Sequence, residues 1–428
     1  SKINLSQLVL LGLGSLIGSG WLFGAWEASS IAGPAAIISW IIGFIVIGTI
    51  AYNYIEIGTM FPQSGGMSNY AQYTHGSLLG FIAAWANWVS LVTIIPIEAV
   101  SAVQYMSSWP WEWAKPMGAL MKDGSISTIG LFAVYVIIAI FSLLNYWSVK
   151  LLTSFTSLIS VFKLGVPLLT IIMLMISGFD TNNYGHSASA FMPYGSAPIF
   201  AATTTSGIIF SFNAFQTIIN MGSEIKNPEK NIARGIAISL TLSAILYIVL
   251  QSTFITSMPS SMIHEHGWNG INFNSPLADM AILLGINWLA ILLYVEAVVS
   301  PFGTGVSFVA VTGRVLRAME KNGHIPKFLG KMNEQYNIPR VAIVFNAIIS
   351  MIMVTLFRDW GTLAAVISTA TLVAYLTGPT TVISLRKMAP KMTRPFKANI
   401  LKFMAPLSFV LASLAISLAK WPTTAEVI

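Results

Sequence analysis

Ionisable side chains inside long apolar segments are the residues of this sequence best placed to do chemistry. Lys163 and three glutamates, Glu27, Glu98 and Glu296, lie within such segments. A charge in apolar surroundings is costly, so each is expected to have a partner or a role in binding or proton relay. Plainer alternatives stay open: Lys163 reaching the membrane interface, Glu98 and Glu296 as neutral, hydrogen-bonded carboxyls, and Glu27 as a solvated side chain in an outer vestibule.

The run Gly14-Ser15-Leu16-Ile17-Gly18-Ser19-Gly20 interrupts the first apolar segment. That segment is long enough to cross a bilayer, which takes ~20 residues. An interior glycine costs roughly 1 kcal/mol in a helix relative to alanine, and bare backbone at this depth needs protein or a polar cavity around it. The run predicts a broken helix whose freed NH groups bind an anion such as a carboxylate. The alternative is a stripe of small residues for close helix packing.

A second interruption is expected in the sixth apolar segment, at residues 203–207 and 210–217. This stretch is unusually polar for a membrane helix, and the two segments lie five apart, so they run in opposite directions. Two interrupted helices at corresponding places indicate an inverted-repeat transporter with a binding site near mid-membrane. Ordinary polar packing explains either segment alone but explains the pair poorly.

The composition indicates a polytopic membrane protein. Hydrophobic residues make up 55% of 428 positions, charged residues 9%, and the mean hydropathy is +0.74, whereas soluble domains carry about 25% charge. There is no cysteine for a disulfide or a thiolate metal site. Approximate spans are expected at 5–31, 34–60, 76–107, 127–147, 151–177, 197–222, 233–257, 276–316, 340–357, 360–385 and from about 401, the last of which is expected to be cut short.

Basic residues set the orientation. Seventeen of the 22 Lys and Arg residues fall in one set of alternate loops and four in the other, which predicts a cytoplasmic N-terminus. The net charge of +7 is therefore attributed to the membrane surface, and no nucleic-acid partner is expected. We expect a multi-pass protein of a prokaryotic plasma membrane that contacts lipid and has no obligatory protein partner.

Four motifs resemble those of the amino acid–polyamine–organocation (APC) superfamily, in the order of that family. They are the run 14–20, Glu56 with Pro62-Gln63-Ser64-Gly65-Gly66, residues 224–232, and residues 314–326 with Pro339-Arg340. Residues 145–150 and Phe162-Lys163 most resemble the branch labelled aspartate/proton symporters. The resemblance implies an all-α LeuT-type fold of five helices plus five inverted helices, with spans 1 and 6 broken and at least one further helix. The repeats are expected at 1–180 and 181–390, with a cytoplasmic loop and the start of an additional helix at 391–428; one or two spans are expected beyond residue 428.

The same resemblance implies the binding residues. The substrate carboxylate is expected at Ser19 and Gly20 with Ser15 and Gly18 nearby, and the amino group at carbonyls of Leu16, Ile17 and Phe210. Ser211 and Asn213 are expected close by, and Trp88 and Phe308 as walls of the pocket. Ala214 and Gln216 depart from the family pattern, where Gly and an acidic residue are common, so the second break is expected to differ in shape.

Lys163 corresponds to a lysine that proton-coupled relatives place where sodium-driven ones bind sodium. We expect its ammonium to bond carbonyls near Gly14 and Ile17 and a hydroxyl of the eighth span, Thr304 or Ser307. Loss of the proton would then favour the inward-open state. The sequence thus predicts a proton-coupled amino acid importer, with no cofactor, metal or enzymatic activity; an exchanger of the same fold is the alternative. The scarcity of basic residues within the spans favours a neutral or amine-bearing substrate. The resemblance to the aspartate/proton symporter branch favours aspartate.

Overall fold

The computed structural model describes residues 2–63, 65–147, 150–419 and 427. Ser64, Ser148 and Val149 of the motifs above lie outside the described residues, and the side chain of Ala214 is not described. The first half of the chain forms α1 (Leu5–Leu16), α2 (Gly20–Ala32), α3 (Ala36–Met60), α4 (Met67–Tyr70), α5 (Gln72–Val92), α6 (Ile94–Met106), α7 (Thr128–Trp147), α8 (Lys150–Ser177) and α9 (Ala188–Phe191).

The described second half consists mainly of further helices. It forms α10 (Ala197–Thr205), α11 (Ile208–Phe212), α12 (Gln216–Asn220), α13 (Pro228–Ser257), α14 (Ser260–His266), α15 (Pro276–Leu283), α16 (Asn287–Lys321), α17 (Arg340–Leu356), α18 (Trp360–Tyr375), α19 (Thr377–Met388) and α20 (Leu401–Ser417). Short 3-10 turns join them at η1 (Gly33–Ala35), η2 (Glu112–Leu120), η3 (Thr181–Tyr184), η4 (Asn213–Phe215), η5 (Gly222–Glu224), η6 (Trp268–Gly270) and η7 (Lys327–Gly330). The strands β1 (Met121–Lys122) and β2 (Ser125–Ile126) form a small antiparallel hairpin.

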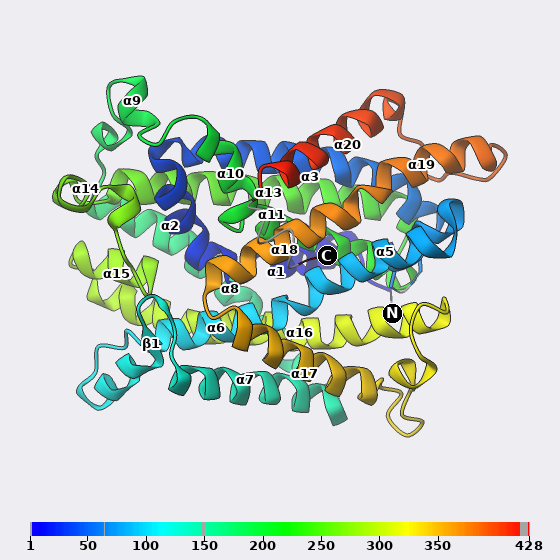
Figure 1. Ribbon diagram of the computed structural model, residues 1–428, viewed down its shortest axis with the longest axis horizontal. Helices are drawn as coiled ribbons and strands as arrows, with labels where there is room; N and C mark the ends of the chain where they lie inside the picture. The colour runs from blue at the N-terminus through cyan, green and yellow to red at the C-terminus, as the bar shows by residue number, and fades with distance from the viewer. Residues whose placement is uncertain (1, 64, 148–149, 420–426, 428) are drawn as a thin grey trace.

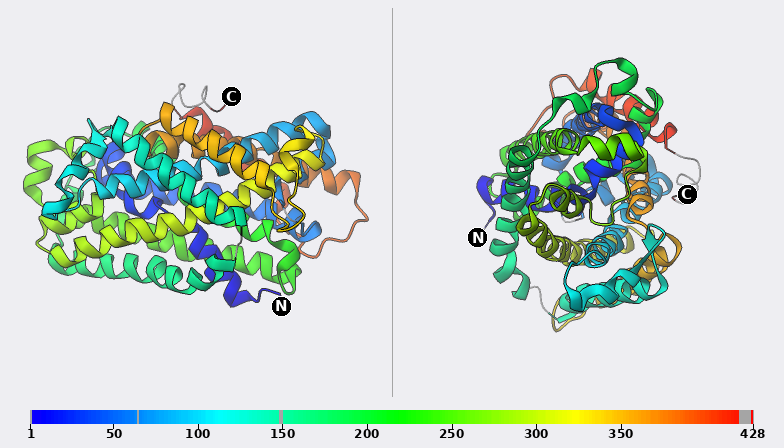
Figure 2. Two further views of the ribbon diagram at one scale, coloured as in Figure 1. Left: turned by 90° about the horizontal axis from the view of Figure 1, so that it is seen from below. Right: turned by 90° about the vertical axis from the view of Figure 1, so that its left-hand side faces the viewer.

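The helices form one elongated bundle. Figure 1 shows α3, α13, α16 and α7 running along its long axis, with α3 beside α13 and α16 beside α7, and the right-hand view of Figure 2 shows these helices nearly end-on. Seven stretches of the described chain are long and apolar enough to cross a membrane: Gly20–Met60, Gln72–Met106, Thr128–Trp147, Ile159–Ser177, Pro228–Ser257, Asn287–Lys321 and Trp360–Met388. Three shorter apolar helices, α1, α17 and α20, accompany them. The all-α polytopic class is confirmed.

The expected span 276–316 is wrong at its start. The chain there forms two helices, α15 and α16, joined by a turn. Gly285 in this turn has a φ of 76°, a left-handed conformation that breaks a helix and that glycine adopts without steric cost. Only α16 is long enough to span a bilayer, because α15 has 8 residues.

Both expected helix interruptions are present. In the first, α1 ends at Leu16 and α2 begins at Gly20, so Ile17, Gly18 and Ser19 lie outside either helix. In the second, α10 ends at Thr205 and α11 begins after Gly207, whose φ is 86°. A Cβ at Gly207 would lie 2.7 Å from the Trp360 ring, so both conformation and close packing require glycine.

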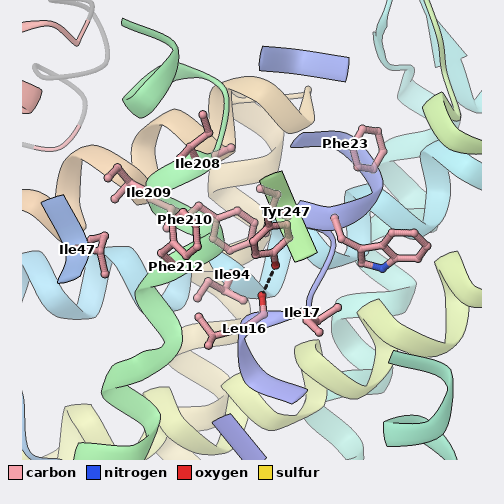
Figure 3. Packing of buried hydrophobic residues seen from close by; sticks show 14 of the residues in the cluster. Leu16, Ile17, Phe23, Ile47, Ile94, Ile208, Ile209, Phe210, Phe212 and Tyr247 are labelled. Atoms are coloured by element: carbon pink, nitrogen blue, oxygen red, sulfur yellow. Dashed lines mark hydrogen bonds between the residues drawn. The ribbon is translucent and has the colours of Figure 1, made fainter. Parts of the chain in front are cut away.

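The two interrupted segments pack against each other, with α2 touching α10 and α11, and α1 touching η4. Figure 3 shows buried residues of this region, with Leu16 close to Tyr247, Phe210 and Phe212. Glycine also allows helices to pack closely elsewhere in the bundle, as at Gly305 of α16, which lies against the ring of Phe141 on α7. The fold thus places both breaks in the middle of a tightly packed bundle.

An ion pair ties α3 to α19 far from the breaks. The carboxylate of Glu56 is fully buried and accepts hydrogen bonds from Arg386 Nε at 3.1 Å, Arg386 Nη2 at 2.5 Å and the Ala398 amide at 3.0 Å. Through the Ala398 amide the carboxylate holds the 389–400 loop against the bundle, and removing one member of the pair would leave an uncompensated buried charge.

Candidate functional site

Side chains from other helices satisfy the backbone groups freed by the first break. The Tyr247 hydroxyl of α13 donates to Leu16 O at 2.7 Å, drawn as the dashed line in Figure 3. The Ser300 hydroxyl of α16 lies 3.5 Å from Ile17 O. Unpaired backbone groups in an apolar interior are costly, so these contacts are what allow the chain to leave the helical path here.

Lys163 joins three helices at this break. Its Nζ donates to Gly14 O of α1 at 2.7 Å and to Thr304 Oγ1 of α16 at 2.5 Å, and the residue is only 4% exposed. The ammonium therefore lies in the bundle interior between α8, α1 and α16, and not at the interface. Its function in proton coupling stays a prediction.

The two other partners considered for Lys163, the Ile17 carbonyl and Ser307, make different contacts in this structure. Ile17 O receives the Ser300 hydroxyl, and the Ser307 hydroxyl donates to Gly303 O of its own helix at 2.9 Å. Ser307 lies about one helical turn beyond Thr304, and a serine inside a helix readily bonds the carbonyl four positions earlier. Which of two neighbouring hydroxyls meets the ammonium depends on helix rotation, which the sequence does not specify.

The backbone NH group of Ser19 holds the carboxylate of Glu98, from α6. Both Glu98 oxygens lie 3.1 Å from Ser19 N, and the Ser19 hydroxyl donates to Oε1 at 3.1 Å. Trp360 Nε1 donates in turn to the Ser19 hydroxyl at 3.0 Å. The position expected for a ligand carboxylate therefore contains a carboxylate of the protein itself.

A small cavity lies beside this contact. Its volume is about 10 Å³, room for at most one water molecule, which needs ~10–15 Å³, so the site is closed to an amino acid. It is lined by Ser15, Leu16, Gly18, Gly20, Ile94, Glu98, Phe210, Ser211, Asn213, Thr304 and Phe308. Most residues expected at the binding site are thus brought together around one space between the two breaks.

Trp88 is not among the residues that line this cavity, and its place as a pocket wall stays a prediction. Its indole NH donates to Asn346 Oδ1 of α17 at 2.9 Å, and its ring stacks on Phe345 at 6.1 Å between centroids. The hydrogen bond and the stacking orient the side chain toward α17. An aromatic residue in a membrane segment carries no sequence signal of which neighbour it faces.

Helix α18 supports the second break. The Phe210 amide donates to Ser368 Oγ at 3.1 Å, Asn213 Nδ2 to Thr371 Oγ1 at 3.3 Å, and the Tyr375 hydroxyl to Asn213 O at 3.1 Å. Sequence reasoning missed these three α18 residues, although their spacing of three and four positions marks one helix face. Gln216 Nε2 donates to Tyr375 OH at 3.3 Å, which gives Gln216 a structural contact.

The two breaks touch through glycine. A Cβ at Gly20 would lie 2.5 Å from Ser211 Oγ, and a Cβ at Gly18 would lie 2.8 Å from Glu98 Oε1. Real Cβ atoms do not approach other atoms this closely, so side chains at these positions would push the breaks or the carboxylate apart. The glycines of the run are thus required by close approach as well as by helix interruption.

The remaining intramembrane carboxylates differ from Glu98 in their surroundings. Glu296 of α16 is fully buried, and the Ser300 hydroxyl and the Trp21 indole are its neighbouring donors, although neither meets strict hydrogen-bond geometry. Glu27 of α2 is half-buried and lies close to Gly361 at the start of α18. No group of three His, Cys, Asp or Glu residues among those described is arranged to hold a metal ion.

A second, larger cavity of about 370 Å³ lies beside α15, outside the membrane-spanning helices. Asp279 lines it, and its carboxylate accepts the Ser275 amide at 3.0 Å. Burial raises the pKa of Asp279 to about 6, while hydrogen bonds from the amides of Ser275 and Asn274 oppose the shift. Burial therefore outweighs the amide hydrogen bonds at the start of α15, and folding favours the protonated carboxyl.

Comparison with known proteins agrees with this arrangement. The profile of the family described as "Amino acid permease" matches residues 3–426. The glutamate/serine transporter AimA of Bacillus subtilis (strain 168) is 51% identical over 427 residues, covering 100% of this chain and 79% of the relative. The aspartate-proton symporter of the same organism is 34% identical over 426 residues, covering 99% and 80%. The chain therefore belongs to the amino acid permease family of the APC superfamily and is a multi-pass integral membrane protein.

Proposed function

We propose that this protein takes up an amino acid together with protons, by alternating access across a prokaryotic plasma membrane. The observation that carries the proposal is the buried Lys163 ammonium, which bonds Gly14 O on one side and Thr304 Oγ1 on the other. This ammonium, with its two hydrogen-bond acceptors, links α1 to α16. We call this link the Lys163 strut. The relative named as an aspartate-proton symporter supports proton coupling.

The strut would couple protonation to movement. With its proton, Lys163 Nζ donates to both helices and holds the inner half of the first span against α16. Without its proton, the amine has one donor fewer and no charge, and charge-assisted hydrogen bonds are roughly twice as strong as neutral ones. Release of the proton would therefore loosen α1 and favour opening toward the cytoplasm, which is one half of an alternating-access cycle.

The substrate is proposed to be an amino acid whose carboxylate binds at Ser19 and Gly20, at the N-terminus of α2, and whose amino group meets backbone carbonyls at the breaks. Glutamate, aspartate and serine are the first candidates, because two relatives are named for them. A dicarboxylate would need a cation for its second carboxylate, and the candidate is the Lys163 ammonium, which bonds Thr304 of the cavity wall. Serine needs none, so a comparison of these substrates is informative.

Uptake by the purified protein in liposomes tests the proposal. With an acidic outside solution, labelled glutamate, aspartate, serine, leucine and arginine are offered in parallel to wild type, Lys163→Met and Lys122→Met. Lys122 is an exposed lysine of β1, so Lys122→Met is a matched control for loss of a lysine. We expect gradient-driven uptake of one substrate class by wild type and the control, and its loss in Lys163→Met.

Counterflow separates the proposal from its rival, an exchanger of the same fold. Lys163→Met is expected to retain exchange of substrate across the membrane, which also shows that the variant is folded. Uptake by wild type that ignores the proton gradient but requires amino acid inside the liposome would indicate an exchanger. Lys163 would then have a structural role only, and the proposal of proton coupling would be wrong.

A further inference from the structure

The carboxylate of Glu98 is bound as a ligand carboxylate would be. Both of its oxygens lie 3.1 Å from the Ser19 amide, and Oε1 also accepts the Ser19 hydroxyl. Ser19 directly precedes α2, a 13-residue helix whose N-terminal dipole favours an anion at this point. Glu98 itself is fully buried and comes from a different helix, α6. A side-chain carboxylate of α6 thus lies at the N-terminus of α2, where a free anion could bind.

The groups around the Glu98 carboxylate favour a negatively charged hydrogen-bond acceptor. The Ser19 hydroxyl accepts from Trp360 Nε1 at 3.0 Å, so its own proton is left to point at Glu98. Gly18 leaves the space that Oε1 occupies, since a Cβ there would lie 2.8 Å from that oxygen. Because amide, hydroxyl and glycine all serve one carboxylate, a second carboxylate cannot be bound there at the same time.

Two titratable groups from neighbouring helices interact with Glu98, and a third lies beyond one of them. Lys163 of α8 interacts with it through space, and so does Tyr247 of α13; Glu296 of α16 lies near Lys163. Their hydrogen bonds are otherwise engaged: Lys163 bonds Gly14 and Thr304, and Tyr247 bonds Leu16. If Glu98 left Ser19, it would be a buried carboxylate without its hydrogen bonds, which is costly unless it gains a proton or a cation.

We propose that Glu98 is a tethered substitute for the substrate carboxylate, which fills the Ser19 site in the empty, closed carrier and must be displaced when substrate binds. The inference rests on the proposed function, since it presumes that the substrate carboxylate binds at Ser19. On displacement the Glu98 carboxylate takes a proton from solution on one oxygen, so binding of one substrate anion is linked to binding of one proton. The same contact lets the carrier close without substrate, which net uptake requires and exchange does not.

Equilibrium binding shows whether Glu98 competes with the substrate carboxylate for Ser19 or instead contacts the bound substrate. Labelled serine and labelled glutamate are titrated into detergent-purified wild type, Glu98→Gln and Glu296→Gln between pH 5.5 and 8. Glutamine accepts the Ser19 hydrogen bonds more weakly than a carboxylate, so Glu98→Gln is expected to bind substrate about tenfold tighter at pH 7.5. Wild type should bind more tightly as the pH falls, because a protonated Glu98 competes less, and Glu98→Gln should lose this dependence.

Glu296→Gln is the matched comparison, because it removes an equally buried carboxylate near Lys163 that does not touch Ser19. It should not tighten binding. Weaker binding by Glu98→Gln would overturn the inference and place Glu98 at the substrate amino group. Unchanged affinity and pH dependence would also overturn it while leaving the proposed function intact. If wild type and both variants bind no amino acid, the proposed function fails and the inference falls with it.

The rate of cysteine labelling in the substrate-free protein gives an independent test. The chain contains no cysteine, so a single Ile94→Cys reports access to the cavity that this residue lines. Labelling by a small maleimide is compared in Ile94→Cys with Glu98 present or replaced by Gln. If Glu98 holds the empty site closed, its replacement should speed labelling several-fold, and added substrate should slow it again. Equal or slower labelling would overturn the inference.

Discussion

Replacement of Thr304 by valine tests the Lys163 strut most directly. Valine keeps the branched shape of threonine and replaces the hydroxyl, which accepts from Lys163 Nζ at 2.5 Å, with a methyl group. The ammonium would keep one of its two bonds here, the one to Gly14 O at 2.7 Å. Because Lys163 is only 4% exposed, water cannot readily restore the lost bond.

The size of the effect follows from this geometry. A hydrogen bond to a charged group contributes about 1.5–3 kcal/mol, and leaving such a group unsatisfied in the interior costs at least as much. At about 1.4 kcal/mol per factor of ten, the closed arrangement of α1 and α16 should weaken by roughly 10- to 150-fold relative to open states. Proton-driven uptake should fall by about tenfold or more, with exchange less affected.

The assay is the initial rate of gradient-driven uptake in liposomes, with two controls. Thr304→Ser keeps the hydroxyl and should remain near wild type. Ser307→Ala removes a hydroxyl about one turn away that bonds Gly303 O of its own helix, and should also remain near wild type. Wild-type uptake by Thr304→Val, or an equal loss in Thr304→Ser, would refute the idea that the hydroxyl is one end of a strut.

Two further predictions concern stability. Gly305→Ala would place a Cβ 2.3 Å from the Phe141 ring and should destabilise the protein by about 1–3 kcal/mol, lowering its melting temperature, whereas Gly165→Ala, with open space, should not. Asp279, whose pKa is raised from 3.8 to about 6, binds protons more tightly when folded, so its contribution to stability is lost as pH rises from about 4 to 6. Asp279→Asn should flatten that decline; an unchanged pH profile of thermal unfolding would contradict the assignment.

Helix positions and breaks could be predicted from the sequence, because apolar length and glycine content are local properties. Most spans match helices of the structure, and the breaks at residues 17–19 and 206–207 fall within the expected runs. The expected single span 276–316 was wrong because the helix there is interrupted at Gly285. The residues on both sides are apolar, so hydropathy alone predicts one continuous segment. The expected division into repeats at 1–180 and 181–390 stays a prediction.

The sequence also determined which groups must find partners in the interior, but not which partners they find. A lysine in mid-span requires acceptors, and Gly14 and Thr304 were among those expected for Lys163. Nothing local pairs Glu98 with Ser19, 79 positions away, or directs Trp88 toward Asn346. Those choices depend on the rotation of each helix and the depth at which helices cross, which the packing of the whole bundle sets. The sequence by itself thus determined the charges, the breaks and the membrane spans, whereas only the tertiary structure decided that a carboxylate of the protein fills its own anion site.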